Sequence, residues 1–179
     1  IATWLDALPV AAGTRNTFRR DLRTLFSYCE KRGYCQTNEA RKTERAKAVD
    51  KPAAILTVEQ VSGLLSACDN DSLPYVSISP FAGLRASEVQ KLDWAEVDFD
   101  SALIEVTAAK SKTAQRRLVP ISDNLSSWIQ PLAKLRGPVT PYGLRKRFDA
   151  VKARVGLQPW PQNAMRHSFG SYRLAQCHH

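Results

Sequence analysis

A highly charged stretch divides the sequence into two parts that are expected to fold separately. Residues 37–51 read TNEARKTERAKAVDK, contain few large apolar side chains, and are followed by the segment KPAA. A segment of this composition contributes little to a packed core, so it is typical of a boundary between domains. We therefore predict one domain over residues 1–50 and a second over residues 51–179. A chain of 179 residues can hold one large domain, or one complete small domain and part of another.

The first part is expected to contain an amphipathic helix. From Thr14 onward, apolar residues recur at intervals of three and four, and Gly33 is a natural end for the helix. The apolar positions are Phe18, Leu22, Leu25, Phe26 and Cys29. Four arginines fall mainly on the other side and predict a basic outer face: Arg15, Arg19, Arg20 and Arg23.

The second part is expected to be mainly helical with one small antiparallel β-hairpin, an α+β arrangement. Thr57 and Gln60 form a capping-box pattern that predicts a helix over about 58–68. Further helices are predicted over 73–81, from the turn at Arg85 to Leu92, over 140–156, and from about 163 to 176. The segments ALIEVT at 102–107 and RRLVPI at 116–121 have the composition of two paired strands.

The net charge of +9 is unevenly distributed along the chain. Residues 1–51 carry a net charge of +5, residues 52–108 carry −7, and residues 109–154 carry +9. Two basic segments on either side of an acidic one suit a polyanion held between two surfaces, because each neutralised phosphate releases condensed counterions. A solvated basic face without a ligand is the alternative.

Other features narrow the class of protein further. No run of eighteen or more apolar residues occurs, and the N-terminal sequence IATWLDALPV does not resemble a signal peptide. We therefore expect a cytoplasmic protein that does not associate with membranes. The four cysteines are scattered without CxxC spacing, so neither disulfides nor a structural zinc site is expected.

Three basic residues stand apart because each is predicted to lie where a loop or hairpin meets a helix: Arg85, Lys112 and Arg166. Reactions at a phosphodiester require stabilisation of negative charge on the non-bridging oxygens, which the planar guanidinium of arginine supplies. A lysine on a hairpin could donate a proton to the leaving oxygen as a general acid. Taken singly, each residue is more simply interpreted as a surface residue, and Arg85 could merely pair with Glu88 one helical turn further on.

Taken together, three segments resemble the tyrosine recombinases, also called phage integrases, in order and spacing. They are FAGLRASEVQKLDWAEVDF, KSKTAQRRLVPIS and NAMRHSFGSY. The resemblance extends over roughly residues 14–176. The basic helix ending in YCEKRGY, followed by TNEA, is similar to the second half of the family's core-binding domain. The resemblance implies a partial, SAM-like helical DNA-binding domain followed by a catalytic domain.

The resemblance also implies roles for individual residues. Arg85 in GLRASE corresponds to the first phosphate-binding arginine, and Glu88 to an acid that orders the site. Arg166 in MRHSF corresponds to the second arginine. Lys112, eight residues before the proline of RRLVPI, corresponds to the hairpin lysine that acts as general acid. Lys110 takes that place if the register of the hairpin differs.

The chain departs from the family pattern in two places. Asn163 stands where the family usually has histidine, and an amide can hydrogen-bond a phosphate but cannot exchange a proton near neutral pH. His167 corresponds to a residue that the family often keeps for packing or hydrogen bonding. The family's nucleophilic tyrosine lies a few dozen residues beyond the second arginine, whereas Tyr172 is too near and is expected to be a core residue. We therefore expect a chain that is truncated at its C-terminus or that has lost cleavage.

By this resemblance the partner is double-stranded DNA, clamped between the two domains. The residues expected to contact DNA are Arg15, Arg19, Arg23, Arg145 and Lys146. Strand cleavage and rejoining in the family proceed through a 3′-phosphotyrosyl intermediate, in a homotetramer on DNA and without a metal or nucleotide cofactor, which implies a nucleoid-associated protein. Two alternatives remain: a non-catalytic DNA-binding remnant or regulator, and a helix-turn-helix regulator. The latter would not explain why GLRASE and a hairpin lysine occur together.

Overall fold

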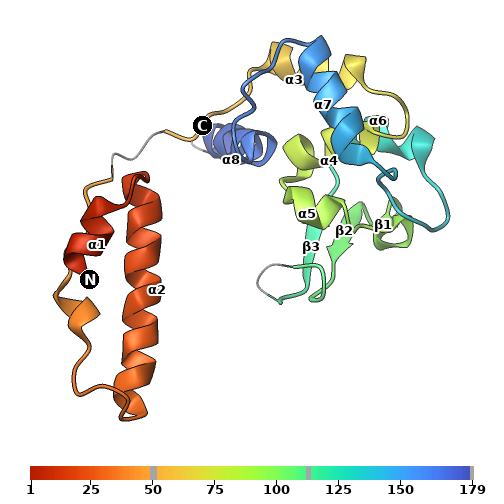
Figure 1. The fold of residues 1–179 in the computed structure, drawn as a ribbon. Coiled ribbons are helices and arrows are strands. Elements are labelled where there is room, and N and C mark those ends of the chain that lie inside the picture. The colour runs from red at the N-terminus through yellow and green to blue at the C-terminus, as the bar shows by residue number, and fades with distance from the viewer. Residues whose placement is uncertain (49–51, 112–113, 178–179) are drawn as a thin grey trace. The chain divides into compact units, whose positions relative to one another are not determined.

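The chain separates into two compact units, Ile1–Pro52 and Ala53–His179, each of which has its own fold (Figure 1). The computed structural model describes residues 1–48, 52–111 and 114–177. The division follows Pro52, at the end of the charged segment that predicted a boundary. The helix predicted from Thr14 is present and begins two residues earlier, as α2 (Ala12–Lys31).

The first unit is built around α2, with α1 (Ala2–Ala7) and the 3₁₀ helix η1 (Glu39–Lys42) packed beside it. Asn38 is buried and fixes η1 to α2. Its side-chain amide donates to the carbonyl of Arg23 at 2.9 Å and to the Ser27 hydroxyl at 2.8 Å, and its side-chain oxygen accepts from the Ala40 backbone N–H at 3.1 Å. Two of these hydrogen bonds connect Asn38 to α2, and the third caps the start of η1.

The apolar stripe of α2 is only partly covered within this unit. None of its residues is buried, and Phe18 and Leu25 retain 39% and 54% of their accessible surface. Among the described residues of this unit, the buried apolar side chains are Leu5 and Ala40 alone. The first unit therefore has a very small apolar core.

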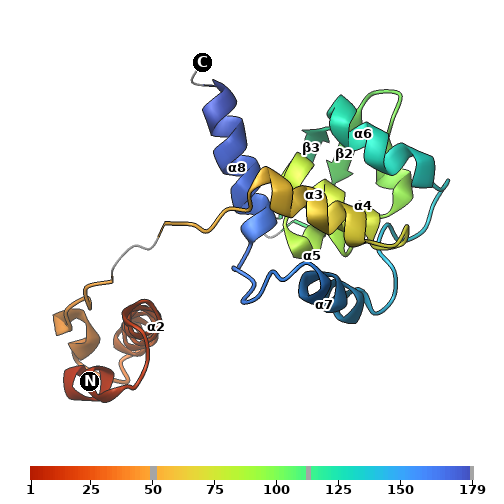
Figure 2. The same cartoon turned by 90° about the horizontal axis from the view of Figure 1, so that it is seen from above.

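The second unit is arranged around α4 (Leu73–Ala82), which contacts α3 (Val58–Ala67), α5 (Ala86–Val89), α6 (Asp123–Ile129) and α8 (Ala164–Cys177) (Figure 2). The sequence of α4, LPYVSISPFA, is apolar on all sides and is buried over nearly its whole length, as expected of a helix surrounded by others. The helix α7 (Leu144–Arg154) packs on α3, and the 3₁₀ helices η2 (Trp94–Glu96) and η3 (Gln130–Leu132) complete the unit.

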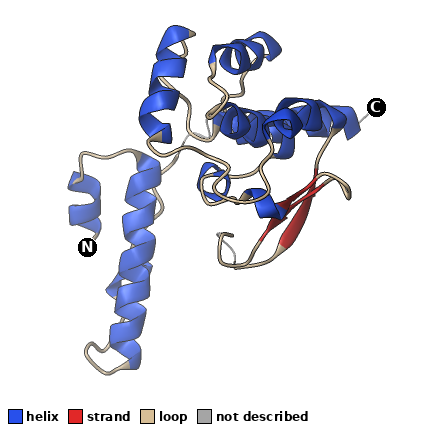
Figure 3. Ribbon diagram, turned by 90° about the vertical axis from the view of Figure 1, so that its right-hand side faces the viewer, coloured by secondary structure: helices blue, strands red, loops and turns tan. Residues whose placement is uncertain are grey.

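A three-stranded antiparallel sheet lies at one side of these helices (Figure 3). The strands β1 (Val97–Asp98), β2 (Leu103–Val106) and β3 (Arg117–Pro120) occur in sequence order. The pairing of β2 with β3 aligns Ile104 with Val119, which confirms the predicted hairpin. The strand β1 was not predicted because two residues are too few to show an alternating pattern.

Several predicted helices are confirmed, with corrections at their ends. The capping box of α3 is complete, since the Gln60 backbone N–H donates to the Thr57 hydroxyl and the Gln60 side-chain oxygen accepts from the Thr57 N–H. The helix after Arg85 ends at Val89 rather than at Leu92. The helix predicted from residue 140 begins only at Leu144, because Gly143 before it has φ +71°, outside the helical region. The helices α1 and α6 were not predicted.

Candidate functional site

Arg85 lies at a sharp turn between α4 and α5 that requires glycine. Gly83 ends α4 in the left-handed conformation at φ +65°, and its N–H donates to the carbonyl of Ser79 at 3.1 Å. A Cβ atom at Gly83 would overlap the ring of Phe169 on α8. The turn then passes through buried Leu84 and places Arg85 at the N-cap of α5, with its side chain 32% exposed. The turn thus places the Arg85 side chain near the surface, beside the close contact between Gly83 and α8.

Glu88 holds Arg85 at this turn. Its carboxylate is 1% exposed and accepts from the Arg85 backbone N–H at 2.8 Å and from Arg85 Nη1 at 3.0 Å. One acid therefore satisfies the free N–H at the start of α5 and orients the guanidinium of the same residue.

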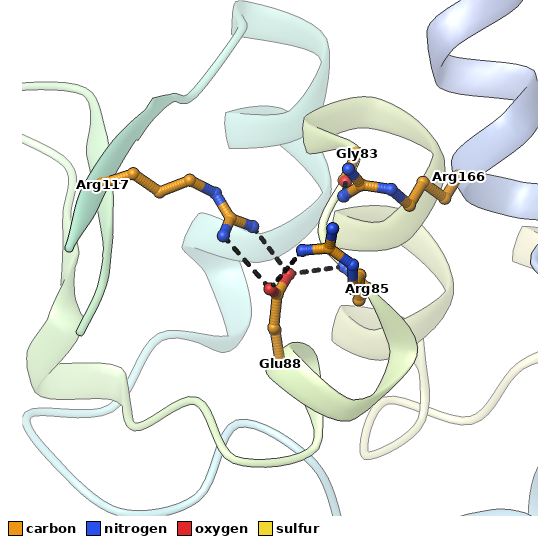
Figure 4. A network of polar contacts seen from close by, with 5 residues as sticks. All are labelled: Gly83, Arg85, Glu88, Arg117 and Arg166. Carbon is orange, nitrogen blue, oxygen red and sulfur yellow. Dashed lines mark hydrogen bonds and ion pairs between the residues drawn. The ribbon is translucent and has the colours of Figure 1, made fainter. Parts of the chain in front are cut away.

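Arg117 on β3 is the second partner of Glu88, and the sequence did not single it out. Its Nη1 and Nη2 atoms donate to the two carboxylate oxygens at 3.1 and 2.6 Å (Figure 4). The side chain of Arg117 is 32% exposed, whereas that of the neighbouring Arg116 is 62% exposed and pairs with Glu105. Successive strand residues point to opposite faces, so one arginine of the pair had to face the helices. The sequence signal was the RR pair itself, read together with this alternation.

The environment of Glu88 keeps its carboxyl group ionised over the ordinary pH range. Burial by itself would raise the pKa of Glu88, but hydrogen bonds from the Arg117 side chain and from Arg85 outweigh it and lower the pKa from 4.5 to about 2. The carboxylate can therefore act as a permanent negative anchor for both guanidinium groups.

Arg166 approaches the same turn from α8. Its Nη1 atom donates to the carbonyl of Gly83, and Figure 4 shows its side chain reaching from α8 to a place beside Arg85. Burial lowers the pKa of Arg166, and the nearby Arg85 charge adds to this effect. Two guanidinium groups from distant parts of the chain thus lie beside each other (Figure 4), and such a pair favours an anion between or above them.

Asn163 and His167 lie at the start of α8, close to Arg166 in sequence and space. Asn163 is exposed, has φ +56°, and its carbonyl accepts the backbone N–H of His167 at 2.9 Å. A small cavity of about 60 Å³ is lined by Asn163 and Arg166, and a hollow of about 430 Å³ is lined by Arg166 and His167. Asn163 and His167 therefore both border the space next to Arg166.

The predicted general acid, Lys112, lies outside the described residues. Lys110, the alternative, is described, and its Nζ atom forms an ion pair with Glu96 at 2.6 Å with the lysine side chain 25% exposed. Tyr172, which was expected to be a core residue, is instead 39% exposed on α8, and its hydroxyl donates to the carbonyl of Leu56 at 2.9 Å. That bond connects α8 to the segment before α3, so Tyr172 has a structural partner.

The residues expected to contact DNA differ in how freely their side chains are presented. Arg145 and Lys146 on α7 are exposed, as is Arg23 on α2. Arg19, by contrast, donates Nε and Nη2 to the carbonyl of Thr43 at 2.9 and 2.7 Å, and Arg15 donates to the carbonyl of Leu8 at 3.2 Å. Arg15 and Arg19 thus hold the first unit together, whatever else they bind.

Two further features are absent from the described residues, 1–48, 52–111 and 114–177. No group of three or more histidine, cysteine or acidic side chains is arranged to hold a metal ion there. Within the same described ranges, no helix is both long and apolar enough to cross a membrane.

Comparison with known proteins places the chain in a family. The model of the phage integrase family matches residues 54–176. The tyrosine recombinase XerC of Salmonella typhi is 28% identical over 175 residues, which cover 86% of this chain and 57% of that protein. The integrase of Shigella phage Sf6 is 27% identical over 81 residues, which are 45% of this chain and 21% of that protein. The chain belongs to the phage integrase family, the tyrosine recombinases.

Solved structures agree with this assignment. The catalytic domain of bacteriophage HP1 integrase is 29% identical with a TM-score of 0.57, over 70% of this chain and 74% of that one. The Tn1549 transposon integrase, solved in complex with circular intermediate DNA, has a TM-score of 0.70 at 18% identity over 98% of this chain and 70% of that one, a likeness of fold. The chain spans little more than half the length of XerC from Salmonella typhi.

Proposed function

We propose that this chain contains the phosphate-binding site of a site-specific DNA recombinase that cleaves and rejoins DNA strands through a 3′-phosphotyrosyl intermediate. The observation that carries the proposal is that Arg166, bonded to the carbonyl of Gly83, lies beside Arg85, which is held by Glu88 (Figure 4). Two arginines held in this way can bind both non-bridging oxygens of a phosphodiester and stabilise the charge that develops there during attack.

The other predicted site residues have supporting roles in this proposal. Lys112 acts as the general acid that protonates the leaving oxygen, and Asn163 donates a hydrogen bond to the phosphate in place of the family's usual histidine. His167 supports the start of α8. No role as nucleophile is proposed for Tyr172, whose hydroxyl already donates to the carbonyl of Leu56.

Double-stranded DNA is the proposed partner. The net charge of +9, with the exposed Arg23, Arg145 and Lys146, supplies the electrostatic attraction for a phosphate backbone. The intact protein is proposed to work as a homotetramer on DNA, with residues 1–50 as the second half of a core-binding domain, in the cytoplasm and associated with the nucleoid. No metal or nucleotide cofactor enters this proposal.

The test is formation of covalent protein–DNA complex by the intact gene product on a nicked suicide substrate. Arg85→Ala and Arg166→Ala should each abolish the complex, because each removes charge stabilisation from the transition state. Arg116→Ala is the matched control, since Arg116 is exposed, pairs with Glu105, and should leave the yield unchanged. Normal yield from both site variants would rule out the proposed reaction. A wild-type protein that binds DNA without forming any complex would favour the non-catalytic remnant, for which Asn163 in the histidine position is the supporting observation.

A further inference from the structure

Glu88 accepts more side-chain hydrogen bonds from Arg117 than from Arg85. Arg117 donates two N–H groups, one to each carboxylate oxygen, whereas the Arg85 side chain donates only one. The remaining bond to Glu88 comes from the Arg85 backbone N–H. The two-point contact with Arg117 thus fixes the plane of the carboxylate, and most of the donors on the Arg85 guanidinium are left over.

The contact between Glu88 and Arg117 determines how far Arg85 is free to bind another anion. A carboxylate with a single arginine neighbour favours a two-point contact with it. Without Arg117, the nearest guanidinium available to the buried Glu88 is that of Arg85, which would have to turn toward the carboxylate to complete such a contact. Arg117 occupies the two carboxylate oxygens and so leaves Arg85 able to bind another anion.

Arg117 also comes from a different part of the fold. It begins β3, where it is aligned with Val106 on β2, and its bonds to Glu88 join the hairpin to α5 (Figure 4). Because side chains alternate along a strand, the adjacent Arg116 points to the other face and pairs with half-buried Glu105. The two adjacent arginines therefore provide a matched pair of positions, one in contact with the site and one away from it.

We propose that Arg117 is a positioning residue that holds Glu88 in a two-point contact and thereby keeps the Arg85 guanidinium available for a DNA phosphate. The inference rests on the proposed function, because it assumes that Arg85 binds a phosphate. Arg117 itself need not touch the DNA. Its effect is exerted on Arg85 through the shared carboxylate.

The experiment measures how strongly Arg85 contributes to duplex DNA affinity in three backgrounds of the 179-residue chain: wild type, Arg117→Lys and Arg116→Lys. Both lysine variants keep the net charge, so general electrostatic attraction is unchanged. A lysine at 117 offers a point charge to Glu88 but cannot make the two-point contact. Dissociation constants are measured at one fixed salt concentration, with circular dichroism to verify that each variant is folded.

Arg85→Ala should weaken DNA binding about tenfold in the wild-type and Arg116→Lys backgrounds, as expected for the loss of a charge-assisted contact. In the Arg117→Lys background the same substitution should weaken binding less than about twofold, because Arg85 no longer faces the phosphate. If Arg117→Lys does not fold, Arg117→Gln takes its place with the same small expected effect. Adding Glu88→Gln to that variant should restore the tenfold effect of Arg85→Ala, because no carboxylate then remains for Arg85 to turn toward.

The possible outcomes distinguish the positioning role of Arg117 from the phosphate-binding role of Arg85. If Arg85→Ala weakens binding equally in all three backgrounds, Arg117 does not position Arg85, while the phosphate-binding role of Arg85 stands. If Arg85→Ala has no effect even in the wild type, the proposed function fails and this inference fails with it.

Discussion

Replacing Glu88 by glutamine should destabilise the second unit by an amount that follows from its depressed pKa. The pKa of Glu88 is lowered from 4.5 to about 2 despite burial, through hydrogen bonds from Arg117 and Arg85. Each factor of ten in proton affinity corresponds to about 1.4 kcal/mol, so the ionised carboxylate contributes about 3 kcal/mol to the free energy of unfolding near neutral pH. Glu88→Gln removes that contribution and leaves two guanidinium groups facing a neutral amide.

The dependence on pH provides a second, independent check of the same reasoning. A carboxyl group with a lower pKa in the folded state stabilises the fold above its unfolded pKa, and this stability is lost as the pH falls through the folded pKa. The wild type should therefore lose the contribution of Glu88 between about pH 4.5 and pH 2. Protonated glutamate resembles glutamine in size and charge, so the difference between the two proteins should shrink over this range.

Urea unfolding followed by tryptophan fluorescence can measure the difference. A Trp4→Phe background leaves Trp94, Trp128 and Trp160, all in the second unit, as the only reporters. Glu105→Gln is the control, because the Glu105 carboxylate pairs with Arg116 at the surface and its replacement should leave the stability nearly unchanged. A Glu88→Gln protein as stable as the control at pH 7, or a difference that stays constant down to pH 2, would refute the argument.

Two further substitutions test the packing that brings α8 to the turn at Arg85. Gly83→Ala should destabilise the second unit by at least about 2 kcal/mol in thermal unfolding, because φ is +65° and the new Cβ overlaps the Phe169 ring. Gly63→Ala inside α3, where the nearest side-chain atom is at 3.9 Å, should be neutral or stabilising by up to about 1 kcal/mol, and equal effects at both glycines would contradict this reasoning. Ser168→Ala should cost about 1–3 kcal/mol in the same assay, because the buried hydroxyl accepts the Leu56 N–H at 2.7 Å, and an unchanged melting temperature would show that this N–H finds another partner.

Local patterns in the sequence predicted the parts of the fold that depend on neighbouring residues. The Thr57–Gln60 capping box and the proximity of Arg85 and Glu88 both span three positions of one helix start, so spacing alone indicates them. The end of α7 was predictable to within two residues, because glycine commonly follows a helix end: α7 ends at Arg154, and Gly156 just beyond it has φ +69°.

Contacts between distant segments could not be predicted in this way. The bond from Arg166 to the carbonyl of Gly83 joins residues 83 positions apart, and the bonds from Arg117 to Glu88 join residues 29 positions apart. A sequence reveals that a basic residue lies in a strand, but the partner of that residue depends on which helix the strand faces. The resemblance to a family identified Arg85 and Arg166 as a pair, whereas the role of Arg117 became visible only from its hydrogen bonds to Glu88 on α5. The roles of these residues in DNA cleavage stay predictions.

The small apolar core of the first unit makes this unit the part of the chain that should unfold locally with the least cost in free energy. Local unfolding requires only that the buried contacts of the unfolding part be broken, and the first unit has few of them beyond Leu5, Asn38 and Ala40. The backbone amides of α2 should therefore exchange with deuterium through opening of residues 1–52 alone. The amides of α4, enclosed by four other helices, should exchange only when the whole second unit unfolds. Proteolysis under native conditions should accordingly begin in the first unit and leave a resistant fragment that contains Arg85 and Arg166.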